Sequence, residues 1–227
     1  MPQNATLSKL AELAEDQWGL LTRRQAEEAG VSPATLQRLS DGATLERVGH
    51  GVYRLAGAPL PDHAELRGAW LQLAPETPAW RRTAEQGVIS HRSAAALFGI
   101  GHLPADVHEF ILPRRRQVRR PDVRIHKALL RDDEWINFRG LLVTKPARIA
   151  SDLLSDGADP ESVAQTIADA LREWHERPYL IARSLEPNAA RLGLRRGDGI
   201  SALRWLLDLI DDPETSLWVA HAREPVV

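Results

Sequence analysis

The first sixty residues begin with a helical spacing of apolar positions and end with two short strand-like segments. Apolar positions recur every three or four residues in three short segments, which is typical of amphipathic helices. Two shorter segments, Leu45-Glu46-Arg47-Val48 and Val52-Tyr53-Arg54-Leu55, then flank Gly49-His50-Gly51, as the strands of a hairpin do. The predicted elements are helices at 6–16, 21–29 and 33–40 and strands at 45–48 and 52–55. This order predicts a winged helix-turn-helix.

Individual residues support the two central helices. Thr22 can cap the first of them, with Gln25 at the capping-box position. Gly30 stands where the helix must end with a positive φ, and Ser32-Pro33 is a cap followed by proline at the first helical position. Ala26 is small enough for the two helices to cross closely. We therefore predict that Thr22–Leu55 folds as one unit.

After a stiff Ala58-Pro59-Leu60-Pro61 linker, helical and strand patterns are mixed. An Arg139-Gly140 turn joins the last two predicted strands, Thr144 is a candidate cap for the next helix, and the tail after Pro213 is expected to be irregular. The predicted elements are helices at 63–74, 90–98, 146–154, from 160 onward and 200–210, and strands at 108–112, 123–127, 135–138 and 141–144. The predicted fold is α+β, with a winged helix-turn-helix domain at residues 1–58 and a mixed α/β domain, ending in helices, at residues 62–227.

The composition excludes several classes of protein. The chain has no cysteine, so disulfides and thiolate metal sites are ruled out. No apolar run reaches the roughly 20 residues that a membrane span needs, and the chain starts without a signal-peptide pattern. We expect a cytoplasmic protein that does not contact the membrane.

Charge is distributed unevenly along the chain. Residues 1–60 carry six Lys/Arg against seven Asp/Glu, residues 61–150 carry fifteen against ten, and residues 151–227 carry eight against fourteen. The densest basic stretch runs from Arg114 to Arg131 and holds eight basic residues with one acidic residue, Asp122. This stretch can contact phosphates or an acidic partner, or it can be a solvated connection between strands.

If the helix-turn-helix binds DNA, its second helix enters the major groove. There Gln37 and Arg38 can read adenine and guanine edges, while arginines before the turn and on the hairpin hold phosphates. The alternative for single arginines is a solvated face with local pairs such as Arg24–Glu28. The candidate DNA-contacting residues are Thr22, Arg23, Arg24, Ser32, Thr35, Gln37, Arg38, Arg47, His50, Tyr53, Arg54, Arg114, Arg115, Arg116, Arg119 and Arg120.

Catalytic and cofactor motifs are absent from the sequence. His91 opens a helix without a nucleophile or carboxylate at motif spacing, so we interpret it as a capping or interface residue. His102, His108 and His126 lack metal-ligand spacing, and no phosphate loop, dinucleotide fingerprint or nucleophile elbow occurs. We predict no enzymatic activity, no catalytic residue, no metal and no cofactor.

Two parts of the chain resemble AbiEi-type antitoxins, which are regulators of abortive-infection and type IV toxin–antitoxin systems. The first part contains Gly19-Leu20-Leu21-Thr22-Arg23-Arg24-Gln25-Ala26 and Arg47-Val48-Gly49-His50-Gly51-Val52-Tyr53-Arg54. The second contains Ser90-His91-Arg92-Ser93-Ala94-Ala95-Ala96-Leu97, a basic stretch, and Val143-Thr144-Lys145-Pro146-Ala147-Arg148-Ile149-Ala150-Ser151-Asp152-Leu153. The resemblance covers about residues 5–155.

The resemblance implies a repressor that binds its own promoter and serves as the antitoxin of a nucleotidyltransferase-like toxin. Inverted repeats in the promoter, with self-association on double-stranded DNA, fit such a repressor. Related chains carry a nuclease domain, but residues from Asp156 onward lack a carboxylate-lysine nuclease core. Two alternatives remain open: a winged helix that only docks proteins, and a nucleic-acid-processing enzyme.

Overall fold

The structure is a computed structural model that describes residues 3–224. The described chain forms two compact units, which are treated separately. The first runs from the start of the described residues to Gly87 and includes Phe138–Leu141. The second comprises Val88–Asn137 and the chain from Leu142 onward. These units are defined by contacts and not by independent folding. The domain boundaries predicted from the sequence, 1–58 and 62–227, stay a prediction.

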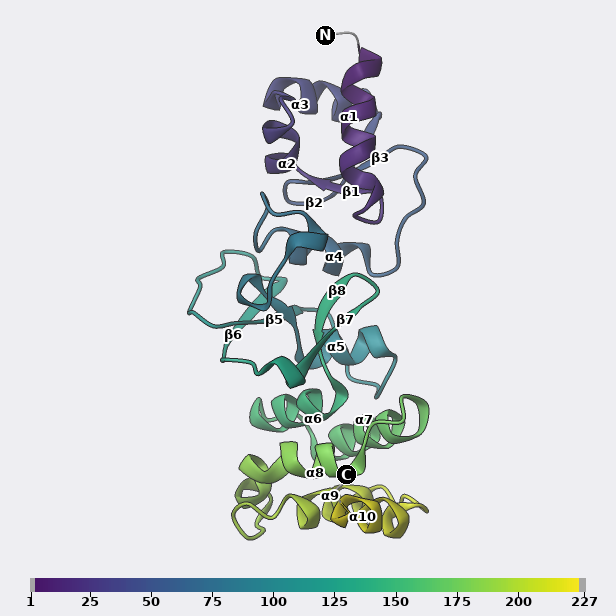
Figure 1. Cartoon of the computed structure of the whole chain (residues 1–227), viewed down its shortest axis with the longest axis vertical. Helices are drawn as coiled ribbons and strands as arrows, with labels where there is room; N and C mark the ends of the chain where they lie inside the picture. Colours follow the sequence, from purple (N-terminus) through teal and green to yellow (C-terminus); the bar gives the residue numbers. More distant parts are fainter. Residues whose placement is uncertain (1–2, 225–227) are drawn as a thin grey trace. The chain divides into compact units, whose positions relative to one another are not determined.

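The first unit begins as a helix-turn-helix followed by a hairpin, as the sequence predicts (Figure 1). Its three strands form a sheet in the order β1-β3-β2, with antiparallel pairing of β1 with β3 and of β2 with β3. Leu10, Leu21, Ala26 and Leu36 are buried together between the helices and the sheet. The elements are α1 (Gln3–Glu15), β1 (Leu20–Thr22), α2 (Arg23–Glu28), α3 (Pro33–Asp41), β2 (Leu45–Gly49), β3 (Val52–Leu55), α4 (Ala64–Leu71), η1 (Ala79–Arg81) and η2 (Ala84–Gln86).

The start of α2 corrects one prediction. The helix expected at 21–29 begins only at Arg23, because Leu20–Thr22 is an extended strand paired with Val52–Arg54. The apolar Leu20-Leu21 pair is equally compatible with a helix, and only the pairing with β3 selects the strand. The predicted caps are confirmed: Thr22 and Gln25 form a capping box, and Ser32 caps α3.

The turn between β7 (Trp135–Phe138) and β8 (Leu141–Thr144) is the part of the later chain that packs in the first unit. The Trp18 indole Nε1 donates a hydrogen bond to the Arg139 carbonyl at 3.1 Å. The Arg67 guanidinium donates to the same carbonyl at 3.3 Å and lies 4.3 Å from the centre of the Trp18 ring. The predicted Arg139-Gly140 turn is confirmed, with positive φ at both residues.

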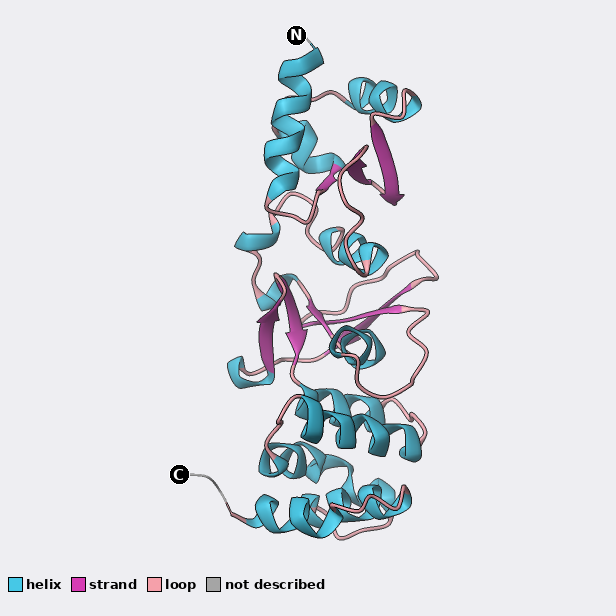
Figure 2. Ribbon diagram, turned by 90° about the vertical axis from the view of Figure 1, so that its right-hand side faces the viewer, coloured by secondary structure: helices cyan, strands magenta, loops and turns pink. Residues whose placement is uncertain are grey.

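The second unit is a five-stranded mixed sheet with helices (Figure 2). The strand order is β6-β5-β4-β8-β7, with β5 parallel to β6 and β4 parallel to β8. Helix α5 packs against β5 and α6, and α8 packs against α6, α9 and α10. The elements are β4 (Val88–Ile89), α5 (His91–Phe98), β5 (His108–Leu112), β6 (Val123–Lys127), η3 (Asp132–Glu134), β7 (Trp135–Phe138), β8 (Leu141–Thr144), α6 (Pro146–Ser155), α7 (Pro160–Glu173), α8 (Pro178–Leu185), η4 (Glu186–Leu192), α9 (Gly199–Leu209) and α10 (Thr215–Arg223).

Two predictions in this unit are wrong. The tail after Pro213 is not irregular: it forms α10, whose Val219 and Ala222 are buried. Thr144 does not cap α6, because the N-cap residue is Lys145 and the buried Thr144 hydroxyl has no hydrogen-bond partner among the described residues. Strand β4 is only two residues long and had no pattern of its own in the sequence. The α+β fold class is confirmed.

Candidate nucleic-acid interface

Helix α3 presents a polar face because its apolar side is fixed in the core. Leu36 and Leu39 are buried, and they orient Gln37 and Arg38 to the exposed side of the helix. The Ser32 hydroxyl accepts a hydrogen bond from the Thr35 amide at 3.2 Å and so defines the first turn. The structure thus exposes Gln37 and Arg38 on one helix, as predicted.

Gln37 and Arg38, the α3 residues predicted to contact base edges, make different contacts in the structure. The Gln37 amide donates to the Asp41 carboxylate at 2.7 Å. Arg38 is exposed, and no ion pair or hydrogen bond of its guanidinium appears among the described residues. Ser32 and Thr35 bond to each other, with 3.0 Å between their hydroxyl oxygens. Arg38 is therefore the side chain on α3 that is most available to a ligand.

The start of α2 places two arginines beside one carboxylate. The Arg23 Nε lies 2.7 Å from the Glu27 carboxylate, and the Arg24 guanidinium lies 3.6 Å from the other oxygen of the same group. Arg24 therefore pairs with Glu27, and not with Glu28 as expected. The hydrogen bond and the charge of Glu27 raise the pKa of Arg23. Both arginines are largely exposed, so phosphate can compete with Glu27 for them.

Thr22 has a structural role at the same place. Its side chain is fully buried, accepts a hydrogen bond from the Gln25 amide at 3.1 Å and donates to the Pro75 carbonyl. A hydroxyl committed in both directions is not available to a ligand. We therefore leave the Thr22 side chain out of the interface proposed below.

Some side chains of the hairpin are exposed, and others already make contacts within the first unit. His50 is exposed in the β2–β3 turn, and Arg47 is exposed with its Nε 3.2 Å from the Gly49 carbonyl. Tyr53 is half-buried against the core of the first unit. Arg54 is only 13% exposed, pairs with Glu46 and donates to the Ala58 carbonyl. The turn itself, Gly49-His50-Gly51, is called the wing tip from here on.

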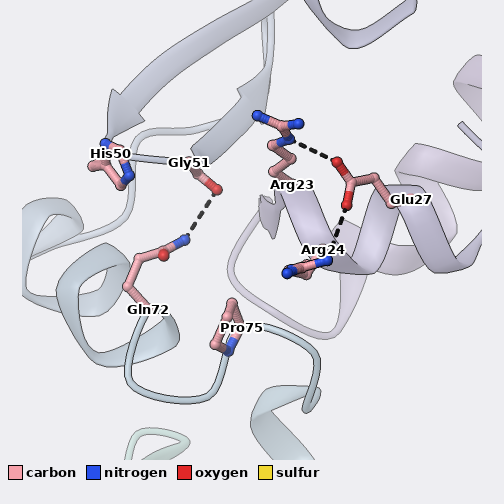
Figure 3. Close-up of a pocket in the computed structure, with 7 residues that line it drawn as sticks. All are labelled: Arg23, Arg24, Glu27, His50, Gly51, Gln72 and Pro75. Atoms are coloured by element: carbon pink, nitrogen blue, oxygen red, sulfur yellow. Dashed lines mark hydrogen bonds and ion pairs between the residues drawn. The ribbon is translucent and has the colours of Figure 1, made fainter. Parts of the chain in front are cut away.

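A hollow of about 370 Å³ lies between the start of α2 and the wing tip (Figure 3). Its basic side chains are those of Arg23, Arg24 and His50, and its acidic side chain is that of Glu27. The remaining walls are Gly51 and two residues from the region of α4, Gln72 and Pro75. Sequence reasoning missed these last two, because a contact such as that of Gln72 with Gly51, 21 residues apart, leaves no signal in local spacing.

The first part of the basic stretch, Arg114 to Arg120, lies in the loop between β5 and β6 of the second unit. Arg114, Arg115 and Arg119 are exposed there, and so is Arg116, which makes a contact of its own. Arg120 is occupied by an ion pair with Asp122, whose pKa falls below its usual range because of the hydrogen bond from Arg120. The predicted DNA-contacting residues thus lie in two units, and in the first unit Arg23, Arg24 and His50 line the same hollow.

His91, predicted as a capping or interface residue, is packed in the interior of the second unit, and the N-cap residue of α5 is Ser90. His91 is buried with a φ of 51° and stacks on His126 with 3.6 Å between ring centres. His126 lies 3.2 Å from the buried Glu109 carboxylate, which also accepts the Arg92 amide at 3.0 Å. Burial opposes the charge of Glu109, but these hydrogen bonds hold its pKa below the usual range.

Residues 3–224 contain neither a metal-binding cluster nor a membrane-spanning helix. No group of three or more His, Asp or Glu side chains among these residues is arranged to hold a metal ion. None of the helices in the same range is long and apolar enough to cross a bilayer.

Comparison with known proteins gives one match to a family and none to a curated protein. The family is one of transcriptional regulators and not of enzymes. The matched segment spans α1 through β3, apart from the first turns of α1, so it contains the helix-turn-helix and the hairpin. The resemblance of residues 57–155 to the same antitoxins stays a prediction. Residues 8–56 match the family described as "Transcriptional regulator, AbiEi antitoxin".

Proposed function

We propose that this protein binds duplex DNA through α3, the start of α2 and the wing tip, and represses its own operon as the antitoxin of a toxin–antitoxin pair. The observation that carries the proposal is the exposed, unpaired Arg38 beside Gln37 on the second helix of a helix-turn-helix. An α-helix fits the major groove, and arginine reads guanine through two hydrogen bonds. Such a regulator acts in the cytoplasm, where its promoter lies.

The phosphate contacts in this proposal come from Arg23, Arg24, Arg47 and His50, with Ser32 and Thr35 at the first turn of α3. The exposed arginines of the second unit (Arg114, Arg115, Arg116 and Arg119) add charge toward the same DNA. Three further candidates already make contacts within the protein: Tyr53 packs against the core, Arg54 pairs with Glu46, and Arg120 pairs with Asp122. We assign them an indirect role, in which they hold the neighbouring backbone. The positive charge is local, because residues 1–60 carry a net charge of −1.

The test is binding of the purified protein to the DNA upstream of its own reading frame, with scrambled DNA of equal length as the reference. Arg38→Ala should cost about 1–3 kcal/mol on the promoter and relax the preference for it. Arg81→Ala is the matched control, because Arg81 is an exposed arginine outside the helix-turn-helix and hairpin. Equal binding of promoter and scrambled DNA at physiological salt would refute a specific regulator.

The toxin partner is proposed from the family resemblance. We expect a nucleotidyltransferase-like protein, encoded beside this chain, whose toxicity is suppressed on co-expression. Growth of cells that express the neighbouring reading frame, with and without this protein, measures that suppression. Two copies bound to an inverted repeat would appear as a mass step of two chains per DNA duplex in analytical ultracentrifugation.

A second candidate function is a protein-docking module. It is favoured by the near-neutral charge of residues 1–60 and by the carboxylates that already occupy Arg23, Arg24 and Arg54. A docking module predicts no DNA binding even at low salt, and no effect of Arg38→Ala on function in cells.

A further inference from the structure

One of the residues that hold the wing tip, Gln72, lies beyond the matched family segment. The Gly51 carbonyl accepts two hydrogen bonds, from the Arg23 amide at 2.9 Å and from the Gln72 side-chain amide at 3.1 Å. The first ties the wing tip to the start of α2. The second ties it to the end of α4 (Figure 3). One backbone atom thus joins α2, the hairpin and the segment after α4.

Gly51 fits this contact for a steric reason. Its φ is +64°, and a Cβ at this position would lie 3.2 Å from the Gln72 Nε2. Any larger residue would therefore be strained and would push the Gln72 amide away from the carbonyl. The turn and the glutamine are matched to each other.

Helix α4 is packed tightly and holds Gln72 at its C-terminal end. Its residues Leu66–Leu71 are all buried, and Gly68 lets the helix approach Val52 of β3, with 3.6 Å from its Cβ position to a Val52 methyl. The Trp70 indole donates to the Gly87 carbonyl at 2.8 Å. The Thr22 hydroxyl donates to the Pro75 carbonyl just after α4. A side chain attached to such a helix has little freedom to follow a moving hairpin.

We propose that Gln72 is a positioning residue of the DNA-binding surface: it fixes the wing tip so that His50 stands across the hollow from Arg23 and Arg24. The DNA-reading unit then extends through α4, beyond the hairpin and the linker that follows it. This inference rests on the proposed DNA binding. It assigns Gln72 a role through Gly51, and not a contact with DNA.

The first experiment compares Gln72→Leu with Gln86→Leu in the full chain. Gln86 is the matched control because its side chain also donates one hydrogen bond in the same unit, to Thr77 at 3.0 Å. We expect Gln72→Leu to increase amide exchange of Arg23 about ten-fold and to weaken promoter binding about five- to ten-fold, the effect of losing one hydrogen bond. Gln86→Leu should change neither. Gln72→Lys retains a donor and should restore the slow exchange of Arg23.

A double-mutant cycle separates positioning from direct contact. If Gln72 acts through the wing tip, the losses of affinity from Gln72→Leu and Gly51→Ala will be less than multiplicative together, while each multiplies with Arg38→Ala. Unchanged Arg23 exchange in Gln72→Leu, or full multiplicativity with Gly51→Ala, would overturn the inference. If the wild-type chain binds no DNA, the proposed function fails, and Arg23 exchange in the free protein still decides the role of Gln72.

Discussion

Three of the five candidate-interface arginines in the first unit are paired with carboxylates of the same unit. Arg23 and Arg24 share Glu27, and Arg54 pairs with Glu46. Surface ion pairs of this kind contribute little to stability, so they can open when phosphate approaches. They nevertheless reduce the number of free charges on this surface. In the proposed complex, Glu27 would compete with the phosphate backbone for Arg23 and Arg24.

Replacing Glu27 by Gln should release Arg23 and Arg24 at once. We expect promoter binding at low salt to become about three- to ten-fold tighter, with a salt dependence steeper by about one to two in the logarithmic slope. Fluorescence anisotropy over a salt series measures both quantities. Glu12→Gln removes one exposed negative charge from α1 and controls for net charge. Equal effects of the two variants would show that charge alone matters, and not its position.

At the scale of elements, the junction of β1 and α2 depends on buried polar side chains. The Gln17 and Gln25 amides bond to each other in both directions at 3.0 Å, and the Gln17 oxygen accepts the Ala79 amide at 2.9 Å. The Gln25 oxygen also accepts the Thr22 amide at 3.0 Å. These bonds satisfy backbone groups where strand becomes helix, so α2 can begin abruptly at Arg23.

The Thr22 hydroxyl is the central link of this junction. Thr22→Val keeps the shape but removes the cap of α2 and the bond to Pro75, so we expect a loss of about 2 kcal/mol in the free energy of unfolding. Thr22→Ser keeps the hydroxyl and should lose less than about 1 kcal/mol. Urea unfolding measures both. Equal losses in the two variants would contradict a hydrogen-bonding role.

At the scale of the whole molecule, the second unit contains two buried groups that give the stability opposite dependences on pH. Burial, aided by the neighbouring His126, lowers the pKa of His91 to about 3. Burial raises the pKa of Asp152 to about 6, although its ion pair with Arg148 acts the other way. The stability that depends on neutral His91 is present above its ordinary pKa and is lost as the pH falls toward 3. The stability from Asp152 is present at low pH and is lost as the pH rises through 6.

Acidification from pH 7 to pH 5 should therefore cost about 2 kcal/mol through His91 and return about 1 kcal/mol through Asp152. His91→Asn tolerates the positive φ and should reduce the acid loss, while Asp152→Asn should increase it. Midpoints of urea unfolding at the two pH values measure the difference for each variant. If both variants lost stability in parallel with the wild type, the pH dependence would have to come from other groups.

Elements with local signals can be predicted from the amino-acid sequence. Caps, the Gly30 turn, helical spacing and the Arg139-Gly140 turn fixed the helix-turn-helix, the hairpin strands and most later elements within a residue or two. The family resemblance of residues 8–56 follows from the same residues. Exposure of Gln37 and Arg38 was predictable too, because Leu36 and Leu39 define the buried side of α3.

Features that depend on partners far away in the sequence become visible only in the folded chain. Leu20–Thr22 became a strand because β3 was available for pairing, and Thr215–Arg223 became a helix because its apolar side is buried by the helices around it. Gln72 reached the wing tip, and His91 stacked on His126, across separations that no local spacing records. Local propensity selects between helix and turn within a few residues, but burial and pairing energies come from neighbours in space, and these decided the rest.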